Sequence, residues 1–179
     1  YPFDWIFSSL ETITHSILDD FNVFLDKTYY ISVSPSECGH KLYNPKLNFK
    51  NTDNMFNHMN PLTNTDHYSY YCRCVDRFRL LLQSDKQKLF TIIFTRNTES
   101  KQNIEIFNEF LKKYTTNYRL LVIFHTVTGT VSHTFSSNDN IDYLVLQTIS
   151  NTGGVVFDNI IDNQYLEKFI LQHYNFYID

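Results

Sequence analysis

The sequence predicts an α/β fold, a single domain over residues 1–179 with a central, mostly parallel, Rossmann-like sheet flanked by helices. Two apolar runs, LFTIIFT at 89–95 and RLLVIFH at 119–125, have the continuous hydrophobicity of strands covered on both faces. Between them, residues 102–115 place apolar side chains at helical spacing. Strand, helix and strand in this order form the unit from which parallel sheets are built.

The first half of the chain is expected to begin with a helix. Ser8 and Glu11 have the spacing of a capping box, and apolar residues then recur with helical periodicity, which predicts a helix over Ser9–Lys27. The aromatic and β-branched run at 29–33 predicts a short strand. Residues 34–64 show little periodicity and are expected to form a long loop, a kind of segment that often has a function.

The remaining elements follow from the same signals. Asp66 is expected to cap a second helix that runs to about Gln83. Short strands are predicted at 131–135 and 142–148, and a helix at 164–173. The pair Gly153–Gly154 predicts a turn.

Composition excludes several classes of protein. The net charge is −4 and there is no long basic stripe, which argues against nucleic acid as a partner. No apolar run approaches the roughly 20 residues of a membrane span. Three cysteines do not suggest a secreted disulfide scaffold and fit a reducing, intracellular setting. Because the chain begins at Tyr1, we expect it to be a fragment of a longer protein.

The first candidate site is the opening segment Tyr1-Pro2-Phe3-Asp4-Trp5. In the functional interpretation, Asp4 is a site carboxylate and Trp5 a wall of the binding site. In the structural interpretation, the segment is a packed anchor and Asp4 accepts local backbone hydrogen bonds.

The second candidate combines Cys38, His40 and His58 in the long loop. A thiolate needs a neighbouring base or cation to be reactive at neutral pH, and an imidazole can supply it. The same residues could instead be an ordered loop with solvated histidines. A metal site with His67 is a third interpretation, but the ligand spacings do not match zinc motifs, so neither a metal nor a cofactor is predicted.

The third candidate consists of Arg73, Arg77 and His125. The two arginines are four residues apart on one helix face, where they could hold an anion or, with Asp76, form a solvated ion-pair face. His125 ends a predicted buried strand, and ligands of α/β sheets bind beyond the carboxyl ends of strands. A histidine in that place can also be purely structural.

The opening motif is similar to the PFDW signature of the DUF1796 family, whose members are described as papain-like cysteine peptidases. Further resemblance lies in Phe56-Asn57-His58 and in the arginine-containing helix before Leu89-Phe90. The resemblance implies roles for Asp4 and His58 and a nucleophilic cysteine before the PFDW motif. The composition, without any alanine, is similar to that of members from large DNA viruses, which would place the protein in the host cytoplasm or the virion.

Three functions therefore remain open. The first is a cysteine-dependent acyl hydrolase or transferase, with His58 as base, Asp4 as its orienting acid and Cys38 as a further candidate nucleophile. The second is a glycan-modifying enzyme that uses a nucleotide-linked sugar, and the third is a non-catalytic binding module. The substrate would be a peptide, an acyl group or a sugar. We predict that Phe56, His58 and Pro61 pack toward Phe3, Asp4 and Trp5 and form one site wall with them.

Overall fold

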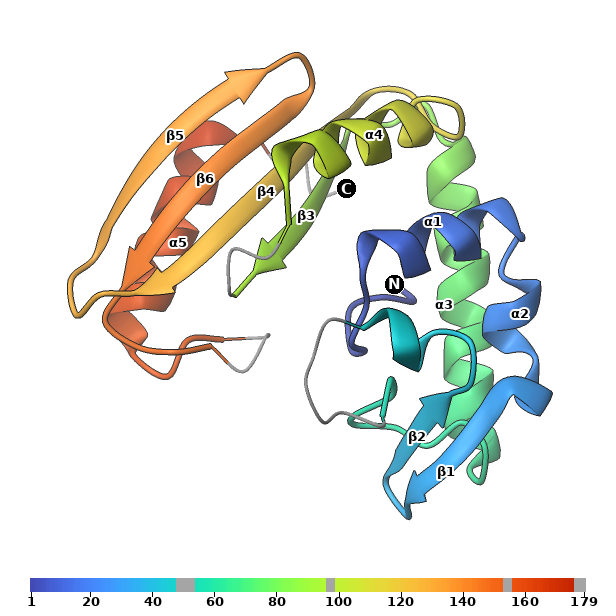
Figure 1. Cartoon of the computed structure of the whole chain (residues 1–179). Helices are drawn as coiled ribbons and strands as arrows, with labels where there is room; N and C mark the ends of the chain where they lie inside the picture. Colours follow the sequence, from blue (N-terminus) through green and yellow to red (C-terminus); the bar gives the residue numbers. More distant parts are fainter. Residues whose placement is uncertain (48–53, 96–98, 153–155, 176–179) are drawn as a thin grey trace. The chain divides into compact units, whose positions relative to one another are not determined.

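The computed structural model describes residues 1–47, 54–95, 99–152 and 156–175. The chain divides into two compact units, which are described separately here (Figure 1). The first unit contains residues 1–85 and 109–116, and the second contains residues 86–108 and 117–179. The fold is mixed α/β, as predicted, with a four-stranded, mostly parallel sheet and a separate two-stranded antiparallel sheet. That the chain is a single domain stays a prediction.

The four-stranded sheet belongs to the second unit and has the strand order β3-β4-β6-β5. Strand β3 (Lys88–Phe94) pairs in parallel with β4 (Tyr118–Val127), which pairs in parallel with β6 (Ile141–Thr148). Helix α4 (Lys101–Leu111) connects β3 to β4, which confirms the predicted strand–helix–strand unit. The last strand, β5 (Ser132–Asn138), is antiparallel to β6, so the sheet is mixed.

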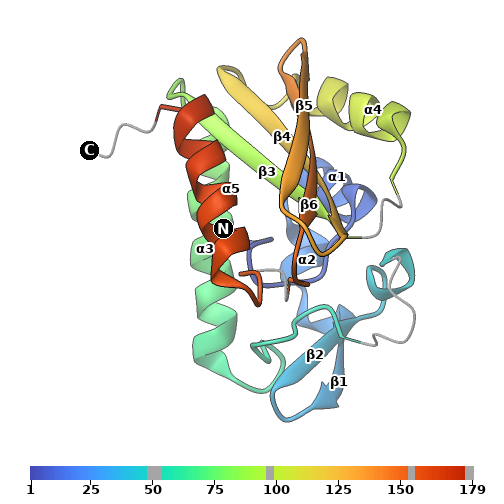
Figure 2. The same ribbon diagram turned by 90° about the vertical axis from the view of Figure 1, so that its left-hand side faces the viewer.

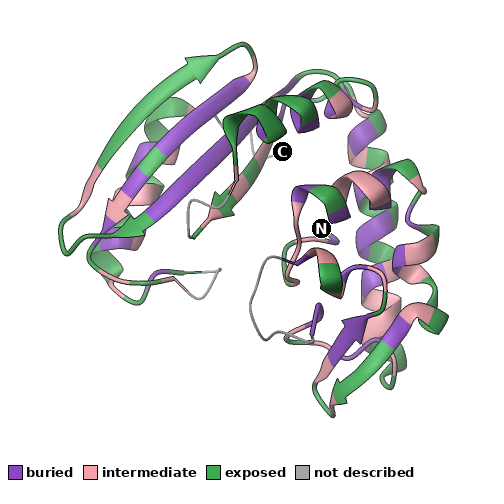
Figure 3. Ribbon diagram, viewed as in Figure 1, coloured by how far each residue is buried: buried purple, intermediate pink, exposed green. Residues whose placement is uncertain are grey.

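Burial differs sharply between the strands. Strands β4 and β6 lie in the middle of the sheet and are mostly buried, whereas β5 at one edge is exposed (Figure 3). The prediction that residues 89–95 are covered on both faces is wrong, because β3 is the other edge strand and alternates between half-buried and exposed side chains. Its apolar run therefore indicated a strand but not its place in the sheet.

Helices cover both faces of this sheet, as Figure 2 shows with the sheet nearly edge-on. Helix α5 (Ile160–His173) packs Phe169 against a cluster that includes Leu121, Ile123 and Leu144. On the other face, the ammonium of Lys101 at the start of α4 lies 4.9 Å from the ring centre of Tyr143. The predicted turn at Gly153–Gly154 lies outside the described residues.

The first unit begins with a helix that is shorter than predicted. Helix α1 spans Leu10–Leu18 and is capped by Ser9, not by Ser8. It ends where Asp20 and Phe21 adopt left-handed backbone angles, with φ of +50° and +59°. The Asp19 carboxylate then accepts a hydrogen bond of 2.6 Å from the amide of Val23. Such local side-chain bonds compete with a continuing helix, and only the short α2 (Asn22–Leu25) and a 3₁₀ turn (Lys27–Tyr29) follow.

The segment predicted as a long loop contains regular structure. Strand β1 (Tyr30–Ser34) forms an antiparallel hairpin with β2 (Glu37–His40), and a 3₁₀ turn (Asn44–Lys46) follows. Phe56 forms a further antiparallel bridge with Cys38. Helix α3 (Thr65–Gln83) then matches the predicted second helix, but Asn64 caps it instead of Asp66, by accepting from the amides of Asp66 and His67.

Aromatic rings form the core of the first unit. Phe24 is fully buried and contacts the rings of Phe3, Phe21, Phe56 and Tyr71, with ring centres 5.7–6.1 Å apart. All four pairs are edge-to-face, an arrangement that aromatic quadrupoles favour. The core therefore joins the opening segment, the segment at 54–60 and helix α3 within one unit.

Candidate functional site

The segment at 54–60 is a tightly held turn that presents His58. Phe56 and Met55 are fully buried, Asn60 is 1% exposed, and His58 between them is exposed. The two backbone hydrogen bonds between Cys38 and Phe56, of 3.2 and 2.9 Å, attach the segment to β2. His58 therefore projects from a backbone whose neighbouring side chains are fixed by the core, which is how precise sites are built.

Two asparagines hold this turn at its ends. The Asn60 amide group donates to the carbonyls of Ser34 and Glu37, at 2.9 and 3.2 Å, and its oxygen accepts from the amides of Leu62 and Thr63. The Asn54 amide group donates to the Glu37 carboxylate at 2.8 Å. Sequence analysis did not identify either residue, because asparagine is common throughout this chain. The only available signal was their position on both sides of Phe56-Asn57-His58.

Trp5 lies directly against His58. The two ring centres are 5.8 Å apart and the ring planes are nearly perpendicular, at 88°. Trp5 is 41% exposed, so the pair forms part of the surface. A hydrogen bond of 2.9 Å from the Phe7 amide to the Met55 carbonyl ties the opening segment to the turn that bears His58. This contact confirms the predicted approach of His58 to Trp5.

The other parts of that prediction fare differently. Phe3 and Phe56 do not form a wall on the surface but pack on the same buried ring, Phe24. The Asp4 carboxylate is bonded to the amino group of Tyr1. In the part of the chain that the structure describes, no hydrogen bond joins Asp4 to His58. The structure thus brings together Trp5 and His58 and does not pair the imidazole with its predicted acid.

Cys38 and His40 are both buried in the hairpin. Burial raises the pKa of the Cys38 thiol, and its sulfur lies 3.3 Å from the Gly39 carbonyl oxygen, to which the thiol donates. A buried thiol with a raised pKa is a poor nucleophile. The environment of Cys38 therefore disfavours the nucleophilic role considered for it.

His40 is a structural histidine in every contact it makes. Its ring is stacked between Tyr29 and Tyr43, with ring centres 5.6 and 4.2 Å away. The amides of Leu42 and Tyr43 donate to Nδ1, so Nε2 carries the proton and donates to the Val23 carbonyl at 3.2 Å. Burial lowers the pKa of His40 to about 4, which keeps the ring neutral.

The two predicted arginines lie exposed on α3. Asp76, their expected partner, instead binds Arg79, which also donates to the Asp20 carboxylate at 2.8 Å. The Arg77 guanidinium lies 3.1 Å from the sulfur of the buried Cys74. Sequence analysis did not single out this Cys–Arg pair, although the i, i+3 spacing on a helix is its signal.

His125 lies in the second unit, near the carboxyl end of β4, and is 3% exposed. Its Nε2 is 2.6 Å from the Thr148 hydroxyl, which donates to the Ser150 carbonyl at 2.7 Å. Burial lowers the pKa of His125, and its Nδ1 has no hydrogen-bond partner among the described residues. Arg73 and Arg77 belong to the first unit and His125 to the second, so the three predicted residues are described in separate units.

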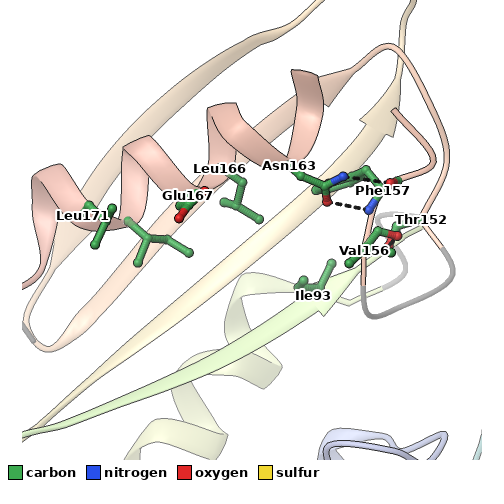
Figure 4. A pocket seen from close by; sticks show the side chains of 9 residues that line it. Ile93, Thr152, Val156, Phe157, Asn163, Leu166, Glu167 and Leu171 are labelled. Atoms are coloured by element: carbon green, nitrogen blue, oxygen red, sulfur yellow. Dashed lines mark hydrogen bonds between the residues drawn. The ribbon is translucent and has the colours of Figure 1, made fainter. Parts of the chain in front are cut away.

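A cavity of about 290 Å³ lies near the same end of the sheet, beside α5 (Figure 4). Its lining is mostly apolar and includes Ile93, Phe157 and Leu166, with Glu167 at the side. Phe157 lines the cavity, and its ring also packs against the imidazole of His125, with ring centres 5.0 Å apart. The Asn163 side chain holds Phe157 in place, because its oxygen accepts from the Phe157 amide and its NH₂ group donates to the Phe157 carbonyl, both at 2.8 Å.

The described residues contain no cluster that could hold a metal and no helix that could span a membrane, and the chain has no match among known proteins. Among the described residues, no group of three histidine, cysteine or acidic side chains could hold a metal ion. No helix in the described ranges is long and apolar enough to cross a bilayer. The chain matches no protein-family model, and no curated protein or solved structure shows significant similarity to it. The resemblance to DUF1796 therefore stays a prediction.

Proposed function

We propose that the surface formed by Trp5 and His58 is part of the active site of a cysteine-dependent acyl hydrolase or transferase, in which His58 is the general base. The observation that supports this proposal is the contact between the exposed His58 and Trp5. A general base must reach the proton that it removes, and an exposed imidazole on a fixed turn meets that condition. The indole beside it provides an apolar wall that can orient a substrate.

The proposal assigns only part of the catalytic machinery to the described residues. Cys38 is unsuited to be the nucleophile because its thiol is buried and its pKa is raised. The nucleophile stays where the resemblance expects it, in a stretch before the PFDW motif. Asp4 forms no hydrogen bond with His58 in the part of the chain that the structure describes, so its role as the orienting acid stays a prediction from the resemblance.

The test compares two histidines in a protein that includes a cysteine-containing stretch before the motif. The His58→Gln variant should lose turnover of acyl esters and peptides by about 100-fold or more, the usual range for removing a general base. His133→Gln is the matched control, because His133 is also exposed but lies on β5. Equal turnover in the two variants would refute the role of His58.

A non-catalytic binding module is the second candidate function. The observation that favours it is the exposure of two aromatic side chains on the opening segment, Tyr1 at 45% and Trp5 at 41%. Exposed rings on a fixed backbone bind peptides and sugars without chemistry. This function predicts that Trp5→Ala abolishes binding whereas His58→Gln leaves it nearly unchanged, as measured with arrays of oligosaccharides and peptides.

A further inference from the structure

Strand β5 is an edge strand whose outer side is open. It pairs antiparallel with β6 over seven residues, from Ser132 to Asn138, without a shift in register. Its other side has no strand partner among the described residues, and β5 is the outermost strand of its sheet in Figure 1. Residues 133–138 are all exposed. The outer side of β5 therefore presents backbone N–H and C=O groups that can pair with another strand.

The two strands of the other sheet do not present an edge of this kind. The register of β1 shifts between Ser32 and Ser34, and a bulge of this kind turns an edge strand away from further pairing. The bridge between Phe56 and Cys38 lies on the outer side of β2. In contrast, residues 132–138 contain no lysine, arginine, acidic residue or proline. Strand β5 thus lacks the features by which proteins usually keep their edge strands apart.

Side chains on one face of β5 hold the strand in place. The His133 Nδ1 lies 2.7 Å from the Tyr165 hydroxyl oxygen, and the ring of Phe135 packs edge-to-face on Phe169, with ring centres 5.3 Å apart. Both partners belong to α5. Because the strand is already extended and fixed by these contacts, pairing along its outer side costs little conformational entropy.

The sequence of β5 also suits pairing between two identical strands. Phe135 is the central residue of the seven, so an antiparallel pair centred on it uses the whole strand. In this register Phe135 lies opposite its own counterpart, and Thr134 lies opposite Ser136. Aromatic pairs and hydroxyl pairs stabilise neighbouring strands, and no pair here places like charges opposite each other. Such a two-fold arrangement closes after two chains, because each copy uses the same edge.

We propose that β5 pairs antiparallel with β5 of a second copy of this chain, so that two four-stranded sheets form one continuous sheet in a dimer. The self-complementary, uncharged strand favours a second copy as the occupant of this edge. Pairing along a single strand buries a small interface, so the dimer forms and dissociates with concentration. The proposal concerns the second unit and does not depend on the activity proposed for His58.

Sedimentation velocity of the chain at increasing concentration tests the proposal. The wild type should change from monomer to dimer between about 1 µM and 1 mM, the range of weak specific complexes. Thr134→Lys combined with Ser136→Lys places lysines opposite each other across the pair and should raise the dissociation constant by about tenfold or more. Thr134→Lys combined with Ser136→Glu places opposite charges there and should keep the dissociation constant within about threefold of the wild-type value.

A pair of lysines elsewhere in the second unit is the matched control. Gln102 and Ile106 are exposed on α4, so Gln102→Lys combined with Ile106→Lys should leave the dissociation constant within about twofold. Far-UV circular dichroism of each variant establishes that it folds. Amide hydrogen exchange of the wild type provides an independent measurement, because exchange in residues 132–138 should slow as the concentration rises.

Three results would overturn the proposal. One is a wild-type chain that stays monomeric up to about 1 mM. Another is a dimer that the lysine pair on α4 weakens as much as the lysine pair on β5 does. Equal weakening by the two β5 variants would refute the register centred on Phe135. Slower exchange confined to residues outside β5 would place the interface elsewhere, and it too would refute the proposed pairing.

Discussion

His40 and His58 lie in the same irregular segment of the sequence, yet the structure uses them in opposite ways. His40 is buried between two tyrosines, and three backbone groups satisfy its ring nitrogens. His58 is exposed and meets one indole edge-to-face. The comparison teaches that a histidine in an irregular segment becomes available for chemistry only where the backbone turns it outward. The neighbours of His58, not its own identity, decide this.

The largest expected effect distinguishes His58 from its neighbour Phe56. Phe56→Ala should lower the free energy of unfolding by about 4 kcal/mol, because it leaves a cavity among Phe24, Tyr30 and Tyr71. His58→Ala should change it by less than about 0.5 kcal/mol, as expected for an exposed side chain. Urea unfolding followed by the fluorescence of Trp5, the single tryptophan, measures both. Similar losses for the two variants would contradict the division of this turn into an anchor and a site.

The next effect concerns pH and His40. The folded pKa of His40 is about 4 and the ordinary value is 6.5, so the unfolded chain binds the proton more tightly. The contribution of the neutral His40 to the free energy of unfolding is therefore fully present above pH 6.5 and is lost as the pH falls from 6.5 toward 4. The loss should approach about 3 kcal/mol, since each pKa unit corresponds to about 1.4 kcal/mol.

A His40→Gln variant provides the control for this titration. It should be less stable at pH 7 but should lose less stability than the wild type between pH 6.5 and 4, and its remaining loss should come from His125, whose pKa burial also lowers. Asp26, Asp142 and Asp162 have pKa values lowered below 3.8, so their contributions are lost only at a lower pH. The measurement is urea unfolding at several pH values with Trp5 fluorescence. A wild-type stability that stays flat over that range would refute the neutral, buried state of His40.

The third effect concerns the support of His58 by Asn60. Asn60→Ala should lower the free energy of unfolding by about 2 kcal/mol, because it removes the hydrogen-bond donors to the carbonyls of Ser34 and Glu37 and leaves these carbonyls unsatisfied. It should also reduce any activity that depends on His58, since the turn loses its anchor at one end. Asn57→Ala is a matched control in the same turn, because Asn57 is only half-buried and accepts a single hydrogen bond from Asn54. An Asn60 variant as stable as the Asn57 variant would refute this role.

The parts of the structure that were predicted correctly are those with strong periodicity. The doubly buried β4, helix α3 and the parallel pairing of β3 with β4 follow from local patterns of apolar residues. The end of α1 at Leu18 was missed because hydrophobic spacing continues through Phe21 and Phe24, while the break depends on one carboxylate and two left-handed residues. The hairpin of β1 and β2 was missed because it is stabilised by contacts distant in sequence, such as the bridge between Cys38 and Phe56.

The sequence predicted only one part of the candidate site, the contact between the opening PFDW segment and the segment Phe56-Asn57-His58. The approach of His58 to Trp5 was expected from the resemblance and is present. The roles of His40 and Cys38 could not be inferred, because burial depends on strand pairing that the local pattern does not show. A further cavity of the second unit, which lies at the amino ends of the parallel strands, was not foreseen for a related reason. Its lining comes from four strands and the end of α5, and no single stretch of sequence contains it.

The smallest expected effect tests the contact between Trp5 and His58 directly. Trp5 is the single tryptophan, so its emission reports one place in the molecule, and His58 is the ring that meets it edge-to-face at 5.8 Å. That imidazole covers part of the indole, so His58→Ala should expose more of Trp5 to water and move its emission maximum to longer wavelength at constant pH. His133→Ala is the matched control and should leave the emission maximum unchanged, because the His133 ring packs against Tyr165 and Phe169. The same emission maximum in the two variants would show that His58 does not cover Trp5, and the proposed base would lose its main structural support.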